Sequence, residues 1–242
     1  MPISPDQGST GGGTPVTFTG TGLGGATEVR FGTEPATITA NTPTSVAVVS
    51  PSGAGVVAAT VTTPGGTSNP VPYYYVPPPV VLDVSPASGP TAGGSTVTIT
   101  GRGLAATASV QFGGSTVTPT VVSDSELTVV TPAGPAGTVS LVVSGRGGTA
   151  TATFTFVGPP DLTGFSPASG STTGGTLVDL TGTALSTATG VTFGGDPATS
   201  FAVLSDTRIA AVTPAHALGP VAVAVTTTGG SDTAPGTFLY VL

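Results

Sequence analysis

The sequence contains no cysteine, no lysine and no tryptophan, and each absence excludes a class of chemistry. Without cysteine the chain has no disulfide, no thiolate nucleophile and no cysteine-ligated zinc site. Its basic residues are four arginines against 11 acidic residues, which gives a net charge of −7. Because a nucleic-acid interface needs a basic stripe that releases counterions from phosphates, we expect no nucleic-acid partner.

Charge and long apolar runs are also scarce. Charged residues make up only 6% of the 242, and no apolar run approaches the ~20 residues that span a bilayer. We therefore predict no membrane insertion. The sequence is instead rich in glycine (38) and proline (24), which break it into short apolar stretches. No secretory signal precedes the first of these stretches, so we expect a leaderless chain or one whose leader has been removed.

A Ser-Pro pair recurs with a spacing of 81 residues, at Ser4, Ser85 and Ser166. Each pair is followed by the same order of features: a glycine pair or triplet, a short apolar strand ending in Thr-Gly, a Val-x-Phe-Gly segment, and a Ser-Pro or Thr-Pro pair. A fixed period of this kind indicates tandem structural repeats. The repeats are joined by proline-rich segments, 77–79 and 158–160, which favour extended and semi-rigid backbone.

Within each repeat, apolar residues alternate with polar ones, which is typical of half-buried strands. Val16 and Phe18 are the first example, and Val97 with Ile99 and Val178 with Leu180 repeat it. Short strands broken by Gly/Pro turns predict an antiparallel immunoglobulin-like β-sandwich. We predict an all-β chain of three tandem immunoglobulin-like domains, 1–77, 78–158 and 159–242, in a rod-like array.

The combined pattern of Ser-Pro, Gly-Gly, V-T-I-T-G-x-G-L, V-x-F-G and Thr-Pro resembles the IPT/TIG domain, in three copies and of bacterial type. This resemblance implies an immunoglobulin-like β-sandwich without catalytic residues. Members of that family serve in cell-surface receptors, bacterial surface proteins, polysaccharide-enzyme accessory modules and DNA-binding factors. The last role needs basic loops, which this chain lacks.

The stretch GTGLGG, residues 20–25, matches the G-x-G-x-x-G spelling of a dinucleotide-binding loop. That mechanism requires a helix whose N-terminus holds the pyrophosphate. Here a strand precedes the loop, another is predicted at 29–31, and the copies GRGLAA and GTALST do not keep the spelling. We therefore interpret the stretch as a glycine turn and expect no cofactor.

Other candidate chemistry is sparse. His216, the single histidine, is expected to be a solvated loop residue rather than a catalytic group or metal ligand. Asp124 and Asp206 recur in Ser-Asp-Ser and Ser-Asp-Thr turns, where we expect each carboxylate to bond its own turn. Calcium coordination with Asp196 or Glu126 stays an open alternative, although no D-x-D cluster appears. No pair of titratable groups is placed for acid–base work, so we predict no enzyme activity.

Tyr73-Tyr74-Tyr75 is the single aromatic run. Alignment with Phe154 and Phe156 predicts that its first and third rings face the core and that Tyr74 points outward. An exposed tyrosine can stack on a sugar or anchor a protein partner. Tyr74 is therefore a candidate interaction residue.

The two ends of the chain form a second candidate. The first repeat begins with only three residues before Ser-Pro, whereas its copies have longer leading strands. Written head to tail, the last residues and the first resemble a shortened internal junction, so self-association of this kind would grow a filament. The candidate residues are Met1, Pro2, Ile3, Phe238, Leu239, Tyr240, Val241 and Leu242.

These features favour a non-catalytic structural or adhesive protein whose modules act as a spacer or interaction module of a bacterial surface or appendage. The expected location is extracellular or at the cell surface, and the expected partners are proteins or further copies of the chain. Two alternatives stay open: a self-assembling head-to-tail filament subunit, and a glycan-binding accessory module.

Overall fold

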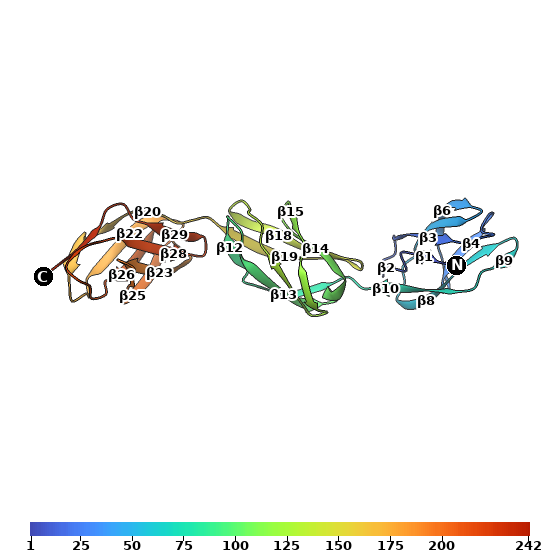
Figure 1. Ribbon diagram of the computed structural model, residues 1–242, viewed down its shortest axis with the longest axis horizontal. Helices are drawn as coiled ribbons and strands as arrows, with labels where there is room; N and C mark the ends of the chain where they lie inside the picture. The colour runs from blue at the N-terminus through green and yellow to red at the C-terminus, as the bar shows by residue number, and fades with distance from the viewer. The chain divides into compact units, whose positions relative to one another are not determined.

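The computed structural model describes residues 1–242, and every strand ladder joins strands of the same repeat. Figure 1 shows three sets of strands, blue to cyan for the first repeat, green to yellow for the second and orange to red for the third. The protein is all-β apart from one single-turn 3₁₀ helix, η1 (Leu104–Ala106), which confirms the predicted fold class.

The first repeat consists of two sheets. One has the order β1-β3-β7-β6, and the other has the order β2-β10-β8-β4-β5 with β9 paired to β8. The strands are β1 (Ile3–Ser4), β2 (Gln7–Ser9), β3 (Pro15–Thr19), β4 (Glu28–Phe31), β5 (Glu34–Pro35), β6 (Thr37–Thr42), β7 (Ser45–Val49), β8 (Gly55–Thr63), β9 (Gly66–Thr67) and β10 (Val71–Val76).

The second repeat has the same plan, with sheets β11-β13-β17-β16 and β12-β19-β18-β14-β15. The strands are β11 (Val80–Ser85), β12 (Ser88–Pro90), β13 (Thr96–Arg102), β14 (Thr107–Phe112), β15 (Ser115–Val117), β16 (Thr120–Ser123), β17 (Glu126–Val130), β18 (Gly137–Gly145) and β19 (Gly148–Val157).

In the third repeat the first sheet, β20-β22-β26-β25, is kept, and the second divides into β21-β30-β27 and β24-β23-β28-β29. The strands are β20 (Asp161–Ser166), β21 (Ser169–Ser171), β22 (Leu177–Thr183), β23 (Ala188–Phe193), β24 (Asp196–Pro197), β25 (Ser200–Ser205), β26 (Arg208–Val212), β27 (Gly219–Val221), β28 (Val223–Thr227), β29 (Gly230–Thr233) and β30 (Phe238–Val241).

Each repeat buries its own core between its sheets, as the alternation predicts. Val16 and Phe18 of β3 are fully buried, while Thr17 between them is half-buried. The pairs Val97/Ile99 and Val178/Leu180 are buried in the same way on β13 and β22. Burying a side chain of this size contributes about 1.5–3 kcal/mol, so the period-two pattern holds each sandwich together.

The repeated Ser/Thr-Pro pairs have a structural role. Ser50, Thr131 and Thr213 are buried, and each hydroxyl accepts a hydrogen bond from the backbone N–H that follows the glycine pair, at 3.1–3.2 Å. Their carbonyls accept a second bond from the N–H of the last glycine of that pair, at 2.9 Å. In each repeat, this one serine or threonine therefore holds the glycine turn against the end of the strand that precedes the serine or threonine.

The glycines of that turn are required by two features at once. Gly12, Gly93 and Gly174 have φ between +74° and +79°. A Cβ at these positions would lie 2.5–2.6 Å from the carbonyl carbon of the proline in the Ser-Pro or Thr-Pro pair of the same repeat, which is Pro51 in the first repeat. A left-handed backbone in close contact with another backbone segment admits only glycine.

Candidate interaction surface

The tyrosine run lies on β10, where alternation sends its side chains to opposite faces. Tyr73 is fully buried and makes an edge-on contact with Phe31, with ring centroids 4.7 Å apart. Tyr75 is also buried, and its hydroxyl donates a 2.8 Å hydrogen bond to the Pro51 carbonyl. Tyr74 is 44% exposed on the outer face of the sheet. The prediction of two inward rings and one outward ring is confirmed.

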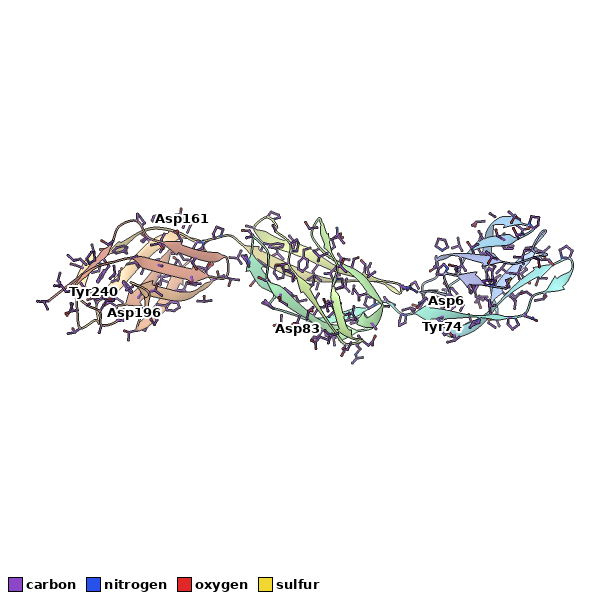
Figure 2. The ribbon with its side chains drawn as sticks, in the orientation of Figure 1. Asp6, Tyr74, Asp83, Asp161, Asp196 and Tyr240 are labelled. Atoms are coloured by element: carbon purple, nitrogen blue, oxygen red, sulfur yellow. The ribbon has the colours of Figure 1, made fainter.

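The surroundings of Tyr74 are largely apolar. In the ladder between β8 and β10 it pairs with Val56, which is 62% exposed, and on its other side it pairs with Gln7 of β2. An open hollow of about 330 Å³ lies along the same two strands, lined by Val56, Val57, Ala58, Pro70, Val71 and Pro72. Figure 2 shows the Tyr74 side chain on this repeat. We call Tyr74, Val56, Pro72 and Gln7 the Tyr74 face.

Sequence reasoning identified Tyr74 but missed its neighbours. Val56 is separated from it by a long stretch of chain, and only the register of β8 against β10 brings the two together. The signal was present in the phase of the alternation, since Val56 is out of step with the buried Ala59 and Val61.

The corresponding positions differ in the other two repeats. Between Phe154 and Phe156 the second repeat has Thr155, whose hydroxyl is hydrogen-bonded to that of Thr138 at 3.0 Å. Between Phe238 and Tyr240 the third repeat has Leu239, which is 43% exposed. An exposed aromatic ring at this register position therefore belongs to the first repeat.

The GTGLGG stretch forms the turn between β3 and β4. Its Leu23 is buried in the core, as are Leu104 and Leu185 at the same place in the other repeats. In the second repeat a Cβ on Gly101 would collide with the Val80 carbonyl oxygen of the first strand, and Gly182 meets Asp161 in the same way. Gly101 and Gly182 thus admit a neighbouring backbone, and in the first repeat the next element after GTGLGG is the strand β4.

The expectation for Asp124 and Asp206 was wrong. The Asp124 carboxylate accepts hydrogen bonds from Gly103 N–H (3.2 Å) and Ala105 N–H (3.4 Å), about twenty residues earlier. Asp206 accepts one from Ser186 N–H at 3.3 Å, and its hydrogen bonds to Ser186 lower the pKa of that carboxyl. The turn itself is bonded by serine instead, because Ser123 and Ser205 accept the N–H two residues on. These carboxylates tie the G-x-G-L loop to the β16–β17 and β25–β26 turns.

The first repeat achieves the same tie with an amide. Asn41 accepts hydrogen bonds from Gly25 N–H (2.7 Å) and Ala26 N–H (3.1 Å), and donates one to the Leu23 carbonyl at 2.6 Å. This explains why the first repeat has proline, Pro43, where the other two have aspartate: the side chain that holds the loop has moved two positions.

His216 is not the solvated loop residue that the sequence suggested. Its ring stacks on Tyr240, with centroids 5.0 Å apart and planes 19° from parallel, and its side chain is 22% exposed. Its Nε2 lies 3.9 Å from an oxygen of Asp196, and its Nδ1 lies 2.9 Å from the Ala217 carbonyl. In Figure 2 Tyr240 and Asp196 lie on the same part of the third repeat. Both ring nitrogens thus face a carboxylate or a carbonyl rather than a serine or threonine hydroxyl, so His216 is not part of a nucleophilic triad.

The residues at the chain ends divide into buried and exposed sets. Phe238 and Tyr240 are fully buried in the third core, and the Tyr240 hydroxyl donates to the Pro214 carbonyl at 3.0 Å. Burial raises the pKa of Tyr240. Leu239, Val241 and Leu242 are exposed. At the other end Pro2 is bonded through its carbonyl to Thr19 N–H, Ile3 pairs with Phe18, and Met1 packs on the first core. The head-to-tail contact stays a prediction.

Ionisable groups are dispersed over the molecule. The ion pairs Glu28–Arg30 (2.7 Å) and Asp179–Arg208 (2.6 Å) each join residues of one sheet at the surface. The structure gathers no three histidine or acidic side chains at metal-binding distance, and Asp124 and Glu126 belong to a different repeat from Asp196 and Asp206. It also contains no helix of the length and hydropathy that a membrane span requires.

The repeat motifs, the two-sheet sandwiches and the buried leucine of the G-x-G-L turn occur three times in this chain. The model of the IPT/TIG domain matches residues 1–75, 79–157 and 160–240. The chain belongs to the IPT/TIG domain family. These three IPT/TIG domains account for nearly the whole sequence, and the predicted resemblance to this family, in three copies, is confirmed.

For individual proteins, the similarity covers only part of this chain or only part of the other protein. Fibrocystin-L of Mus musculus is 45% identical over 67 residues, which are 27% of this chain and 2% of that protein. The extracellular region of plexin A4 is similar over 92% of this chain and 21% of its own, at 22% identity and a TM-score of 0.49. SGBP-B from a xyloglucan utilization locus in Bacteroides uniformis is similar over 66% of this chain and 49% of its own, at 24% identity and a TM-score of 0.33. This chain therefore spans less than half the length of each of these three proteins.

Proposed function

We propose that the protein is a non-catalytic structural or adhesive protein, whose tandem IPT/TIG domains act as a spacer or interaction module of a bacterial surface or appendage. One observation carries the proposal: every strand ladder stays within one repeat, and each repeat buries its own set of apolar side chains. A chain built in this way is a series of modules that can each fold and bear load without the others.

The distribution of polar groups supports a role without catalysis. The carboxylates of Asp124 and Asp206 hold loops, and those of Glu28 and Asp179 pair with arginine in the same sheet. The histidine packs flat on a tyrosine ring. Acid–base catalysis needs titratable groups that converge on one reacting atom. Absence of lysine and the low content of charge also suit a long-lived extracellular chain.

The spacer role is tested by the distance between the first and third repeats. Because the chain has no cysteine, two spin labels can be attached at cysteines introduced at exposed positions, Glu34 and Thr207. The proline-rich joints predict one narrow distribution of distances that does not change with protein concentration. A broad distribution would contradict a semi-rigid spacer. Replacing Pro77, Pro78 and Pro79 by glycine is the matched control and should broaden the distribution.

Recognition of a glycan is a second candidate, and the Tyr74 face favours it. A phenol ring whose register partners on the two neighbouring strands are Val56 and Gln7 can offer stacking to a sugar ring, and Gln7 adds a group able to form hydrogen bonds. We expect Tyr74→Ala to weaken binding to a soluble β-glucan by about tenfold or more, as for loss of an aromatic hot spot. Leu239→Ala, at the same register position and similar exposure in the third repeat, is the control. Equal binding by both variants would assign the affinity to another surface.

A further inference from the structure

The proline-rich segment before the second repeat packs closely on that repeat. A Cβ at Gly147, in the hairpin between β18 and β19, would collide with the Pro77 carbonyl oxygen. A Cβ at Gly101, near the end of β13, would collide with the Val80 carbonyl oxygen. Pro79, which lies between these two contacts in the sequence, is buried. The segment therefore runs from the glycine hairpin to the end of β13 in direct contact with both.

The third repeat holds its own leading segment in the same way. A Cβ at Gly229, in the hairpin between β28 and β29, would collide with the Gly158 carbonyl oxygen. A Cβ at Gly182 would collide with the Asp161 carbonyl oxygen, and Pro160 is buried. The two segments share a sequence type, Pro-Pro-Val-Val in one repeat and Pro-Pro-Asp-Leu in the other. One path is thus made for an extended Pro-Pro-x-apolar segment.

The leading segment also extends the strand beside it. In the third repeat β20 pairs with Gly182 and Thr183, the last two residues of β22. The corresponding residues of the first repeat, Gly20 and Thr21, follow the end of β3 and belong to no ladder. For this reason β3 has five residues, whereas β13 and β22 have seven. The first sheet therefore has an open edge at this end, which another strand can join.

The first repeat keeps the receiving glycines, and no backbone covers them. A Cβ at Gly65, the counterpart of Gly147, would approach only the Thr63 hydroxyl, at 3.7 Å, and one at Gly66 would meet no atom within 4 Å. An open hollow of about 240 Å³ lies at this place. It is lined in part by Thr21, Gly22, Leu23, Val61, Gly65 and Gly66. We call this hollow and the adjoining edge of β3 the leading-segment groove.

We propose that the leading-segment groove binds an extended Pro-Pro-x-Val or Pro-Pro-x-Leu segment of a partner protein. The segment adds to the edge of β3 as an antiparallel strand, with its apolar residue opposite Gly20, as Leu162 lies opposite Gly182. Its second proline takes the place that Pro79 and Pro160 have in their repeats. Addition of a strand to an exposed sheet edge is a common mode of peptide recognition. Such binding rests on the interaction role proposed above, and the spin-label distances test the spacer role separately.

The occupant is not one of the two segments of this type within the chain, because both are engaged in their own repeats. Pro79 and Pro160 are buried, and Leu162 belongs to the third core. The Leu162 N–H also donates a 2.7 Å hydrogen bond to the Asp232 carboxylate. The exposed end of the chain, Leu239 to Leu242, contains no proline, and the net charge of −7 opposes the approach of a second copy. A segment of another protein therefore fits the groove best.

A synthetic peptide tests the groove on the whole chain. The probe is Pro-Pro-Pro-Val-Val-Leu with blocked ends, which copies residues 77–82, and the control is the scrambled Val-Pro-Leu-Pro-Val-Pro. We expect the first peptide to shift the amide NMR signals of Gly20, Thr21, Gly65 and Gly66, and to bind about tenfold or more tightly than the scrambled one, because only its register buries the apolar side chain. Absence of these shifts, or equal binding of both peptides, would overturn the proposal.

Gly65→Ala provides the matched variant. Gly65 has no positive φ and its Cβ would have room, so the first repeat should fold normally. The new Cβ would nevertheless stand where the carbonyl of the bound segment approaches, and we expect about tenfold weaker peptide binding or more. Gly114→Ala, which is equally open and lies outside the groove, should bind as the parent does. Unchanged binding by Gly65→Ala would contradict the proposed path. Self-association of the chain that the peptide reverses would assign the groove to a second copy instead and would equally contradict it.

Discussion

At the scale of single residues, the third repeat departs from the other two in its left-handed turn. Ala184 is the one non-glycine residue with positive φ, at +55°, and it stands where the first two repeats have Gly22 (+72°) and Gly103 (+69°). A side chain in this region costs about 1–2 kcal/mol relative to glycine. Ala184 directly precedes Leu185, which is buried in the third core, so the strained residue lies in the turn that positions this leucine.

Ala184→Gly should therefore stabilise the third repeat by about 1 kcal/mol, since relief of strain exceeds the added entropy of the unfolded chain. Urea denaturation of the variant and the parent protein measures the difference. Ala105→Gly, beside the same turn of the second repeat and without positive φ, is the control and should lower stability by about 0.5–1 kcal/mol. A loss of stability in Ala184→Gly would show that the turn is not strained.

Thr213 makes the second prediction at this scale. Its buried hydroxyl accepts the Thr176 N–H at 3.1 Å and closes the glycine turn. Thr213→Val keeps the shape and leaves that part-buried N–H without its side-chain acceptor, which should cost about 1–3 kcal/mol. Thr213→Ser keeps the acceptor, as Ser50 does in the first repeat, and should lose much less. Similar melting curves for the two variants would exclude the hydrogen bond as the cause.

At the scale of elements, β10 packs against the first core with one face and carries the proposed interaction residue, Tyr74, on the other. Tyr73 and Tyr75 hold the first core, while Tyr74 is free for a partner. Burial raises the pKa of Tyr75 from 10.0 to about 12. The folded state therefore keeps the phenol proton over a pH range in which the unfolded chain has lost it.

The raised pKa of Tyr75 predicts that the free energy of unfolding of the first repeat falls at alkaline pH. With the folded pKa above the unfolded one, the contribution of Tyr75 to stability is complete below pH 10 and is lost as pH rises toward 12. Denaturation of the first repeat at several alkaline pH values should show this fall. Tyr75→Phe should flatten it, and the ring should still fit because the second repeat has Phe156 at this place. An unchanged fall in the variant would assign the titration to another group.

The strands and the inward rings were predictable because alternation is a local pattern and recurs in each of the three repeats. The roles of Asp124, Asp206 and His216 could not be predicted in this way. Each of these side chains contacts a residue that is remote in sequence and is brought close only by the fold. Asp124 reaches Gly103, and His216 meets Tyr240. Val56 joined the Tyr74 face for the same reason, because only strand register sets which residues lie opposite each other.

At the scale of the whole molecule, the proposed boundaries 1–77, 78–158 and 159–242 assign each complete set of ladders to one unit. The family match to 1–75, 79–157 and 160–240 leaves short segments between the units. A spacer made of such units should unfold one module at a time under load, because no ladder transmits cooperativity from one repeat to the next.

The most direct measurement of this central claim is single-molecule extension of the chain between its two ends. The account predicts three separate unfolding events, each releasing on the order of 250 Å of chain, as expected for about 75–80 residues. Variant Thr213→Val should lower the force of one event and leave the other two unchanged. A single event that releases the whole chain at once would contradict a series of independent modules, and with it the proposed spacer function.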